Sequence, residues 1–258
     1  LTNGINNLVV ENYTTAKEYF TQLDIQFPEL PFGKIYLASL KITESYDYAE
    51  EFDESYIREK LKEAESIIKQ LIKKDNKNIW HHYFLGLSSG NYAYYQALRG
   101  SWISAFSNGL DAVKIFNKCI AIDSSFYDSY TAIGTYKYWS SQKTSALNWL
   151  PFFNDEREEG IELLKKSVES AAYNYHLAGY SLIWIYIEQK EPEKAVELAK
   201  KLLNDFPGSR FFMRGLARAY EDVDRSKANE IYYDLLRLIL DDKRNNRYNE
   251  IVIKHKIA

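Results

Sequence analysis

The apolar residues of this chain recur at helical spacing, most clearly in the stretch 187–207. Pro192 suits the first turn of a helix, where its missing N–H would have no partner in any case. Three small or apolar residues follow on one face, namely Ala195, Ala199 and Leu202. Pro207 stands just past the last of them, where a helix is expected to end. The pattern therefore predicts a turn, a helix and a stop.

The same register recurs along the chain, with a small residue in the middle of each predicted helix. These small residues are Ala16, Ala64, Ala112, Gly160, Ala195 and Ala228, at steps of 48, 48, 48, 35 and 33 residues. One turn later come Phe20, Ile68, Phe116, Leu164, Ala199 and Tyr232. A second series on the preceding helices, Ala38, Gly86 and Gly134, also has a step of 48. Two series with one period predict a chain of repeated helix pairs.

These features resemble the tetratricopeptide (TPR) repeat. In that family a small residue lies midway along the second helix, a large apolar residue or Ala follows one turn later, and Pro closes the repeat. The resemblance covers nearly all of residues 12–240 and is firmest in 176–240. It implies an all-α fold, a right-handed α-solenoid of stacked antiparallel helix pairs, whose first helices line a concave groove for peptides or protein segments.

The step of 48 residues departs from the family, whose unit is about 34 residues. The surplus corresponds to roughly four helical turns, or about two turns per helix. We therefore expect helices of about 18–21 residues in the long units and of about 13–16 residues in the last two. Loops could hold the surplus instead. In the third unit, the segment 140–154 breaks the helical pattern and favours that alternative.

The predicted organisation is a single solenoid domain over residues 1–258, with long repeats in about 30–172, ordinary repeats in about 175–241 and a C-terminal cap in 242–258. The expected helices span 15–27, 32–51, 55–74, 79–99, 102–122, 126–141, 155–170, 175–189, 192–205, 211–221 and 225–240. Residues 1–10 show no clear period, and the basic tail is interpreted as a cap or a short extra helix. Trp139, Trp149 and Phe152 predict that segment 140–154 folds back onto the solenoid.

Composition excludes several classes of function. A net charge of −3 and a pI near 5.9 give no electrostatic reason to expect nucleic acid. No apolar run approaches the roughly 18 residues that a transmembrane helix needs. The single cysteine, Cys119, rules out an internal disulfide and is expected to be a buried apolar residue. The chain begins at Leu1, so a removed signal peptide would place it outside the cytoplasm, and the compartment stays open.

No catalytic or cofactor motif is found in the sequence. It has no phosphate-binding Gly-rich loop, no GxSxG, no CxxC and no EF-hand loop. His81 and His82 are adjacent, so on a helix they project about 100° apart, and no second ligand pair accompanies them. Pairs of acids such as Glu158 and Glu162 have lysine neighbours and are interpreted as solvated faces. We expect neither a metal nor a cofactor, and a protein that is not an enzyme.

An acidic and aromatic corner separates the two helices of the first long hairpin. Its members are Glu44, Tyr46, Asp47, Tyr48, Glu50, Glu51, Phe52, Asp53 and Glu54. One interpretation is a binding patch for a basic partner. The other is a solvated helix corner whose acids favour the N-terminus of the next helix.

The resemblance to TPR proteins also implies positions for the groove. They are Tyr83, Leu87, Thr131, Thr135, Tyr138, Tyr180, Trp184, Arg214 and Arg218, and Tyr94 joins them as a further aromatic on the same hairpin. We expect the partner to lie along a stripe centred on Tyr83, Tyr138 and Trp184. The alternative is that these rings are ordinary core between repeats. Aromatics and Thr replace the two-carboxylate clamp of chaperone-tail-binding TPRs, so that ligand class is rejected.

The sequence thus favours a protein–protein interaction scaffold that binds a peptide or protein segment in an aromatic groove within a larger assembly. The alternative is a small-molecule or lipid-binding solenoid with a pocket closed by the 140–154 loop. The open ends of a solenoid also allow self-association. The sequence does not identify the partner.

Overall fold

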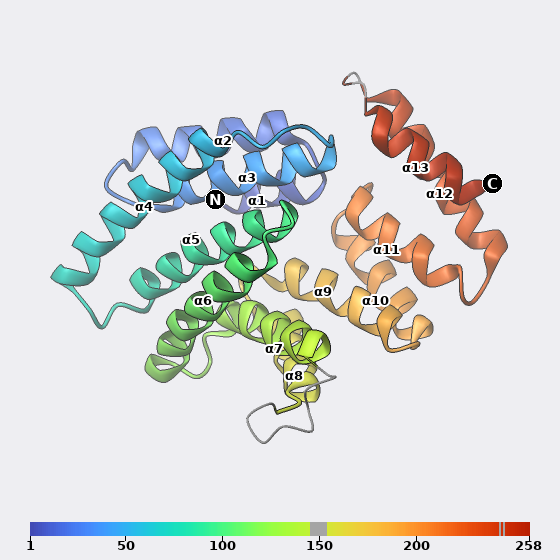
Figure 1. The fold of residues 1–258 in the computed structure, drawn as a ribbon. Helices are drawn as coiled ribbons and strands as arrows, with labels where there is room; N and C mark the ends of the chain where they lie inside the picture. Colours follow the sequence, from blue (N-terminus) through green and yellow to red (C-terminus); the bar gives the residue numbers. More distant parts are fainter. Residues whose placement is uncertain (145–153, 243, 245) are drawn as a thin grey trace.

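The chain is almost entirely helical. The computed structural model describes residues 1–144, 154–242, 244 and 246–258. These residues form thirteen α-helices and one short 3-10 turn, and no strand occurs among them (Figure 1).

The helices follow one another as hairpins, with bounds close to those expected from the sequence. The first three pairs are α1 (Thr2–Val9) with α2 (Tyr13–Gln26), α3 (Phe32–Asp47) with α4 (Glu54–Lys74), and α5 (Ile79–Leu98) with α6 (Trp102–Ile122). Then come α7 (Tyr130–Thr144) with α8 (Arg157–Ser170), α9 (Tyr175–Glu188) with α10 (Pro192–Asp205), and α11 (Arg210–Tyr220) with α12 (Arg225–Asp241). The 3-10 turn η1 (Tyr127–Ser129) precedes α7, and α13 (Arg247–Ile257) ends the chain.

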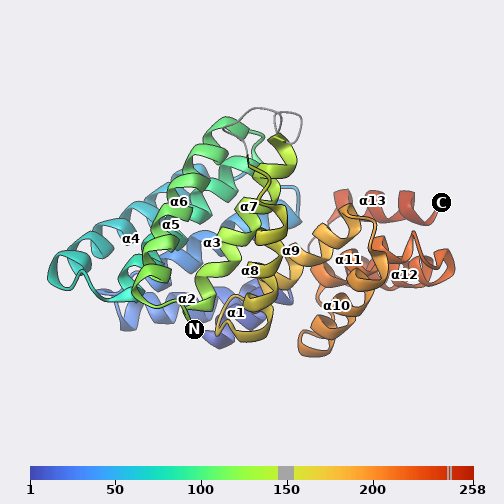
Figure 2. The same ribbon diagram turned by 90° about the horizontal axis from the view of Figure 1, so that it is seen from below.

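Successive hairpins stack into a curved solenoid. Each helix packs on the next, and first helices of neighbouring pairs also touch, since α3 contacts α5, α7 contacts α9 and α9 contacts α11. Figures 1 and 2 show that the stack bends, with the α1–α3 region and the α11–α13 region on either side of α9. The prediction of an all-α solenoid of stacked helix pairs is confirmed.

The two expected helix lengths are present. Helices α4, α5 and α6 have 21, 20 and 21 residues, whereas α9, α10 and α11 have 14, 14 and 11. In the third long unit α7 has 15 residues and α8 has 14, so its helices do not hold the surplus. The prediction for segment 140–154 falls largely on residues 145–153, which lie outside the described part of the chain. In the last repeat α12, with 17 residues, is slightly longer than the expected 13–16, and α11, with 11 residues, is slightly shorter.

One expected helix is shorter than its pattern indicated. Helix α3 was expected to reach Glu51, but it ends at Asp47 after 16 residues. The chain turns there through Ala49, whose φ of 52° is left-handed backbone that cannot continue a helix. Asp53 then accepts a hydrogen bond from the backbone N–H of Tyr56 at 3.0 Å and caps α4. The acidic corner is therefore a connection between two helix ends.

The series of small residues marks where two helices come closest. All six residues of the first series, from Ala16 to Ala228, are buried. Gly134 on α7 and Gly160 on α8 bring two backbones into direct contact, because a Cβ on either glycine would lie 2.6–2.7 Å from the carbonyl oxygen of the other. Cys119 is buried as expected, and burial raises the pKa of its thiol to about 11.

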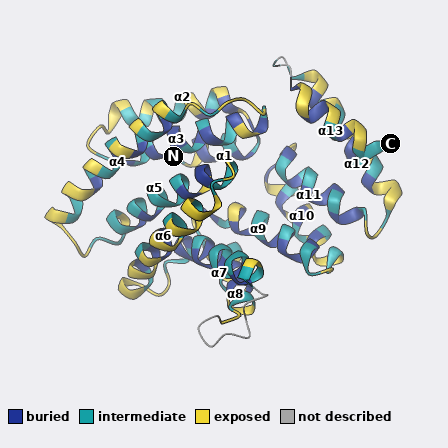
Figure 3. Ribbon diagram, in the orientation of Figure 1, coloured by how far each residue is buried: buried dark blue, intermediate teal, exposed yellow. Residues whose placement is uncertain are grey.

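The ends of the chain, which the sequence left least defined, are also helical. Residues 1–10, without a clear period, form α1, and the basic tail forms the extra helix α13. Figure 3 shows buried residues along the inner side of most helices and exposed residues on the outer helices such as α4. The largest apolar cluster includes Ile5 and Val9 of α1 together with Ile253 of α13. The core therefore includes residues from both ends of the solenoid.

We expect Gly160→Ala to lower the free energy of unfolding by about 1–3 kcal/mol, because the added methyl group would overpack the contact with Gly134. Gly90→Ala on α5 is the matched control, since a Cβ there meets nothing within 4 Å. That control should stabilise the protein by about 0.5–1 kcal/mol through helix propensity. Urea unfolding of the two variants measures these changes. Equal effects would show that Gly160 is not in close contact with Gly134.

Candidate functional site

Two of the three residues at the centre of the predicted groove lie inside the core. Tyr83 and Tyr138 are fully buried. The Tyr83 hydroxyl accepts a hydrogen bond from Nδ2 of Asn174 at 2.7 Å, and the Tyr138 hydroxyl donates to Glu188. Their rings face the packing partners of their own helices, so the alternative interpretation as core describes them.

The positions of Tyr83 and Tyr138 on their helices explain why both are buried. Tyr83 lies three residues before Gly86, and Tyr138 lies four residues after Gly134, so both share a face with a small packing residue. Leu87 and Thr135 follow those glycines by one residue, which turns them about 100° away, and both are half-buried. Thr135 pairs with the hydroxyl of Ser181 at 3.0 Å, and the buried Thr131 pairs with that of Ser167 at 2.6 Å.

Four other aromatic residues, which we call the inner cluster, come from three different first helices. They are Tyr46 of α3, Tyr94 of α5, and Tyr180 and Trp184 of α9. The exposed fraction is 52% for Tyr46 and 47% for Tyr94, while Tyr180 and Trp184 are half-buried. Burial, followed by the proximity of Tyr180 and Tyr46, raises the pKa of the Tyr94 hydroxyl. Tyr94 is thus about half exposed as a residue, while its hydroxyl is desolvated because protein surrounds it on several sides.

The two predicted groove arginines are already engaged within the chain. Arg214 donates to Asp47 at 3.3 Å from each terminal nitrogen. Arg218 contacts Asp222 at 3.1 Å and Glu221 at 3.3 Å on the outer edge of α11. The structure thus brings Tyr94, Tyr180, Trp184 and Arg214 towards one region and leaves Arg218 outside it.

Arg214 also belongs to a second region, where the first and last parts of the chain meet. We call this region the seam, and its central residues are Glu11, Asp47 and Arg210. Here two helix ends cap one another. Glu11 accepts hydrogen bonds from the backbone N–H groups of Arg210 and Phe211, at 3.0 and 2.9 Å, and so caps the N-terminus of α11. In return, the hydroxyl of Ser209 donates to the carbonyl oxygen of Val9, the last residue of α1, at 2.7 Å.

Asp47 is the central charge of the seam, and its side chain is completely buried. Its carboxylate accepts hydrogen bonds from Arg210, from Arg214 and, at 3.1 Å, from the hydroxyl of Tyr13. Its carbonyl oxygen accepts from the side-chain amides of Asn246 and Asn249, which caps the C-terminus of α3. One residue therefore joins α2, α3, α11 and α13.

The acidic corner meets a basic partner within the same chain. Arg244 forms ion pairs with Glu44 and Glu50, and its guanidinium lies 3.7 Å from the centre of the Tyr48 ring. The Tyr48 hydroxyl donates to Asp242. Glu44, Asp47 and Glu50 thus pair with arginines of the same chain, which neither interpretation of the corner anticipated. Asp53 and Glu54 instead serve the N-terminus of α4, as the interpretation as a solvated helix corner proposed.

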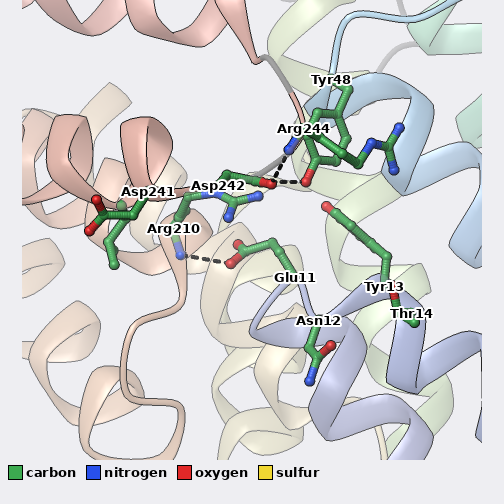
Figure 4. Close-up of a pocket in the computed structure, with 10 residues that line it drawn as sticks. Glu11, Asn12, Tyr13, Thr14, Tyr48, Arg210, Asp241, Asp242 and Arg244 are labelled. Carbon is green, nitrogen blue, oxygen red and sulfur yellow. Dashed lines mark hydrogen bonds between the residues drawn. The ribbon is translucent and has the colours of Figure 1, made fainter.

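A pocket of about 430 Å³ opens at the seam (Figure 4). Its lining comprises Glu11, Asn12, Tyr13, Thr14, Tyr48, Arg210, Leu238, Asp241, Asp242 and Arg244. Polar and charged groups predominate, and the two arginines pair with carboxylates outside this lining, Arg210 with Asp47 and Arg244 with Glu44 and Glu50. Figure 4 shows the hydrogen bond between the backbone N–H of Arg210 and the carboxylate of Glu11, which come from distant parts of the chain.

Burial acts strongly on Glu11. Desolvation raises the pKa of its carboxyl to about 7, although the charge of Arg210 and the two N–H donors act in the opposite direction. The carboxyl of Glu11 therefore titrates well above the ordinary range of a glutamate. The seam combines this carboxyl with the ion pair of Asp47 and Arg210.

Sequence reasoning missed the seam as a unit. The acidic corner and the basic tail could both be recognised in the sequence. Their contact could not be predicted, because the residues that pair are 194–200 positions apart. Glu11, Arg210, Asn246 and Asn249 carried no signal of their own. A residue before the first clear helix and three others near the end of the chain share no period that could connect them.

The histidine pair has a local structural role. Nδ1 of His81 lies 2.9 Å from the carbonyl oxygen of Asp75, and Nε2 of His82 lies 2.8 Å from that of Asn76. Among the residues that the structure describes, no group of three His, Cys, Asp or Glu side chains is placed to hold a metal ion. Within the same residues, no helix is both long and apolar enough to cross a membrane.

Comparison with known proteins adds no family. The chain matches no family model and no curated protein. The function is therefore argued from the inner cluster and the seam alone.

We expect Asp47→Asn to lower the free energy of unfolding by about 3–5 kcal/mol, because it removes the buried carboxylate that pairs with Arg210 and Arg214. Asp111→Asn on α6 is the matched control, since Asp111 and its partner Lys114 are both largely exposed. It should change stability by no more than about 0.5 kcal/mol. Chemical denaturation of both variants checks this, and a small loss for Asp47→Asn would mean that the seam is not closed in solution.

The free energy of unfolding should fall as the pH rises from about 5 to 8. The folded pKa of Glu11, about 7, lies above its ordinary value of 4.5, so its contribution is fully present below pH 4.5 and is lost through pH 7. The loss amounts to about 3 kcal/mol. Glu11→Gln should remove this part of the pH dependence. The measurement is denaturant unfolding at several pH values, and parallel curves for the two proteins would contradict the expectation.

Proposed function

We propose that this chain is a non-catalytic, TPR-like interaction scaffold that binds an extended segment of a partner protein against the inner cluster. The observation that carries the proposal is the partial exposure of aromatic side chains from three separate first helices. Tyr and Trp combine a large apolar face with a polar tip, which makes them frequent anchors of protein interfaces.

The neighbouring groups suit an extended polypeptide. The same helices carry hydroxyl and amide groups, since Ser181, which pairs with Thr135, follows Tyr180, and Asn91, whose amide donates to the carbonyl oxygen of Leu87 at 2.9 Å, lies three residues before Tyr94. Such groups can hydrogen-bond a main chain while the rings contact its side chains. Arg214 already donates to Asp47, a carboxylate that it shares with Arg210.

The titrating groups support a binding role over catalysis. Glu11 has a strongly raised pKa, yet its oxygens cap α11 and face backbone N–H groups. Burial lowers the pKa of His176 to about 4, and this ring packs 5.9 Å from the centre of Phe206. Both groups serve packing and capping, which is a common reason for a perturbed pKa outside active sites.

Binding of a small molecule is the second candidate, and the seam pocket favours it. A volume of about 430 Å³ lies within the range of small-ligand sites. The alternative drawn from the sequence was a pocket closed by segment 140–154, most of which lies outside the described residues. Native mass spectrometry of the purified protein separates the two candidates, because a retained small molecule would add a discrete mass and a scaffold would add none.

We expect Tyr94→Ala and Trp184→Ala each to weaken partner binding by at least about tenfold, because each removes an aromatic anchor. The partner would be captured from the native source, identified, purified and titrated by calorimetry. Tyr233→Ala on α12 is the control, since Tyr233 is also exposed but lies outside the inner cluster. Tyr83→Ala should instead lower the free energy of unfolding by about 3–5 kcal/mol, because Tyr83 is a core residue. Unchanged affinity in both inner-cluster variants would refute the proposed site.

A further inference from the structure

The first half of α6 carries large apolar side chains that no other part of the described chain covers. No residue from Trp102 to Asp111 is buried, whereas the second half of the helix buries Ala112, Val113, Phe116 and Cys119. The exposed fraction is 64% for Trp102 and 90% for Ile103, and Phe106 and Leu110 are exposed as well. Exposed apolar residues clustered in this way call for an explanation, unlike isolated ones.

These residues lie at one end of the molecule. In Figure 2, the turn between α5 and α6 and the end of α7 reach the same edge of the solenoid. The Phe106 ring packs against Tyr136 of α7 with a centre-to-centre distance of 5.4 Å, and Nζ of Lys143 lies 5.7 Å from the centre of the Trp102 ring. We call Trp102, Ile103, Phe106 and Lys143 the apolar tip.

The sequence around the apolar tip lacks acidic residues. The chain has 36 Asp and Glu among 258 residues, yet residues 76–110 and 129–154 contain none. The acids that follow these two stretches are engaged, since Asp111 pairs with Lys114, Asp155 with Arg157 and Glu156 with Lys137. Lys143 therefore gives the tip a positive character within a chain whose net charge is −3.

We propose that the apolar tip is a docking surface for a lipid bilayer that contains anionic headgroups. Trp, Ile and Phe would enter the boundary between headgroups and acyl chains, and Lys143 would remain at the level of the phosphates. Aromatic residues next to Lys or Arg are typical of this boundary, and anionic lipids attract nearby basic side chains.

The extent of the surface favours a bilayer over a second copy of the chain. A stable protein interface buries about 800 Å² on each partner, which usually involves some 20 or more residues. Four projecting side chains at a helix end fall well short of that. A bilayer needs no matching partner surface, because a few inserted aromatic residues and a basic side chain already give reversible binding.

Vesicle co-sedimentation tests the proposal with the full chain. Vesicles of phosphatidylcholine with phosphatidylserine should bind the protein, and Trp102→Ser combined with Ile103→Ser should reduce the partition coefficient by at least about tenfold. Both positions are exposed, so the double variant should keep the melting temperature of the original protein. Ile25→Ser on α2, at a position 73% exposed, is the matched control and should bind as the original protein does.

The charge on the tip has a separate test. Lys143→Gln should weaken binding to vesicles that contain phosphatidylserine and leave binding to pure phosphatidylcholine unchanged, because only the anionic lipid interacts with that charge. Absence of binding by the original protein, or equal binding by the double variant, would overturn the proposal. So would a concentration-dependent dimer in sedimentation velocity that the double variant abolishes, since the tip would then be a protein interface.

Discussion

A single buried carboxylate, that of Asp47, constrains the shape of this solenoid. A buried charge must be paired, and the partners of Asp47 are Arg210 and Arg214, more than 160 residues later in the chain. Stacking of helix pairs would by itself leave the two ends of a solenoid free. Here the first and last repeats cannot separate without breaking the ion pairs of Asp47 with Arg210 and Arg214. The ends are held by charge pairing in addition to the apolar contacts of α1 and α13.

The seam determines how the two ends of the solenoid are placed more than it adds to the net stability of the fold. Replacing buried ion pairs by apolar residues is often neutral, so the pair of Asp47 and Arg210 need not add free energy over a hydrophobic contact. Its effect is directional. Glu11 caps α11, Ser209 caps α1, and two asparagines cap α3, so each helix end has donors or acceptors that only one arrangement satisfies. Such contacts fix the relative position of the two ends.

The sequence predicted what is local and periodic. Small residues such as Ala112 and Gly160 reveal the repeat because close contact between paired helices recurs at a fixed step. The groove was placed less well, since Tyr83 and Tyr138 share a face with the small residues Gly86 and Gly134 and therefore point into the core. Spacing from those glycines could have shown this. The seam had no such signal, because pairing between distant residues depends on the accumulated curvature of all intervening repeats.

The seam and the inner cluster are parts of one arrangement. Tyr46 immediately precedes Asp47 in the last turn of α3. Arg214, which donates to Asp47, is also close to Tyr180, because its charge opposes the rise that burial causes in the pKa of the Tyr180 hydroxyl. The position of Tyr46 relative to Tyr180 therefore depends on the ion pairs at Asp47 as well as on stacking through α5 and α7. A solenoid held only by stacking could bend and change that separation. In this chain, bending would first have to break a buried charge pair, so the inner aromatic surface is held in one geometry.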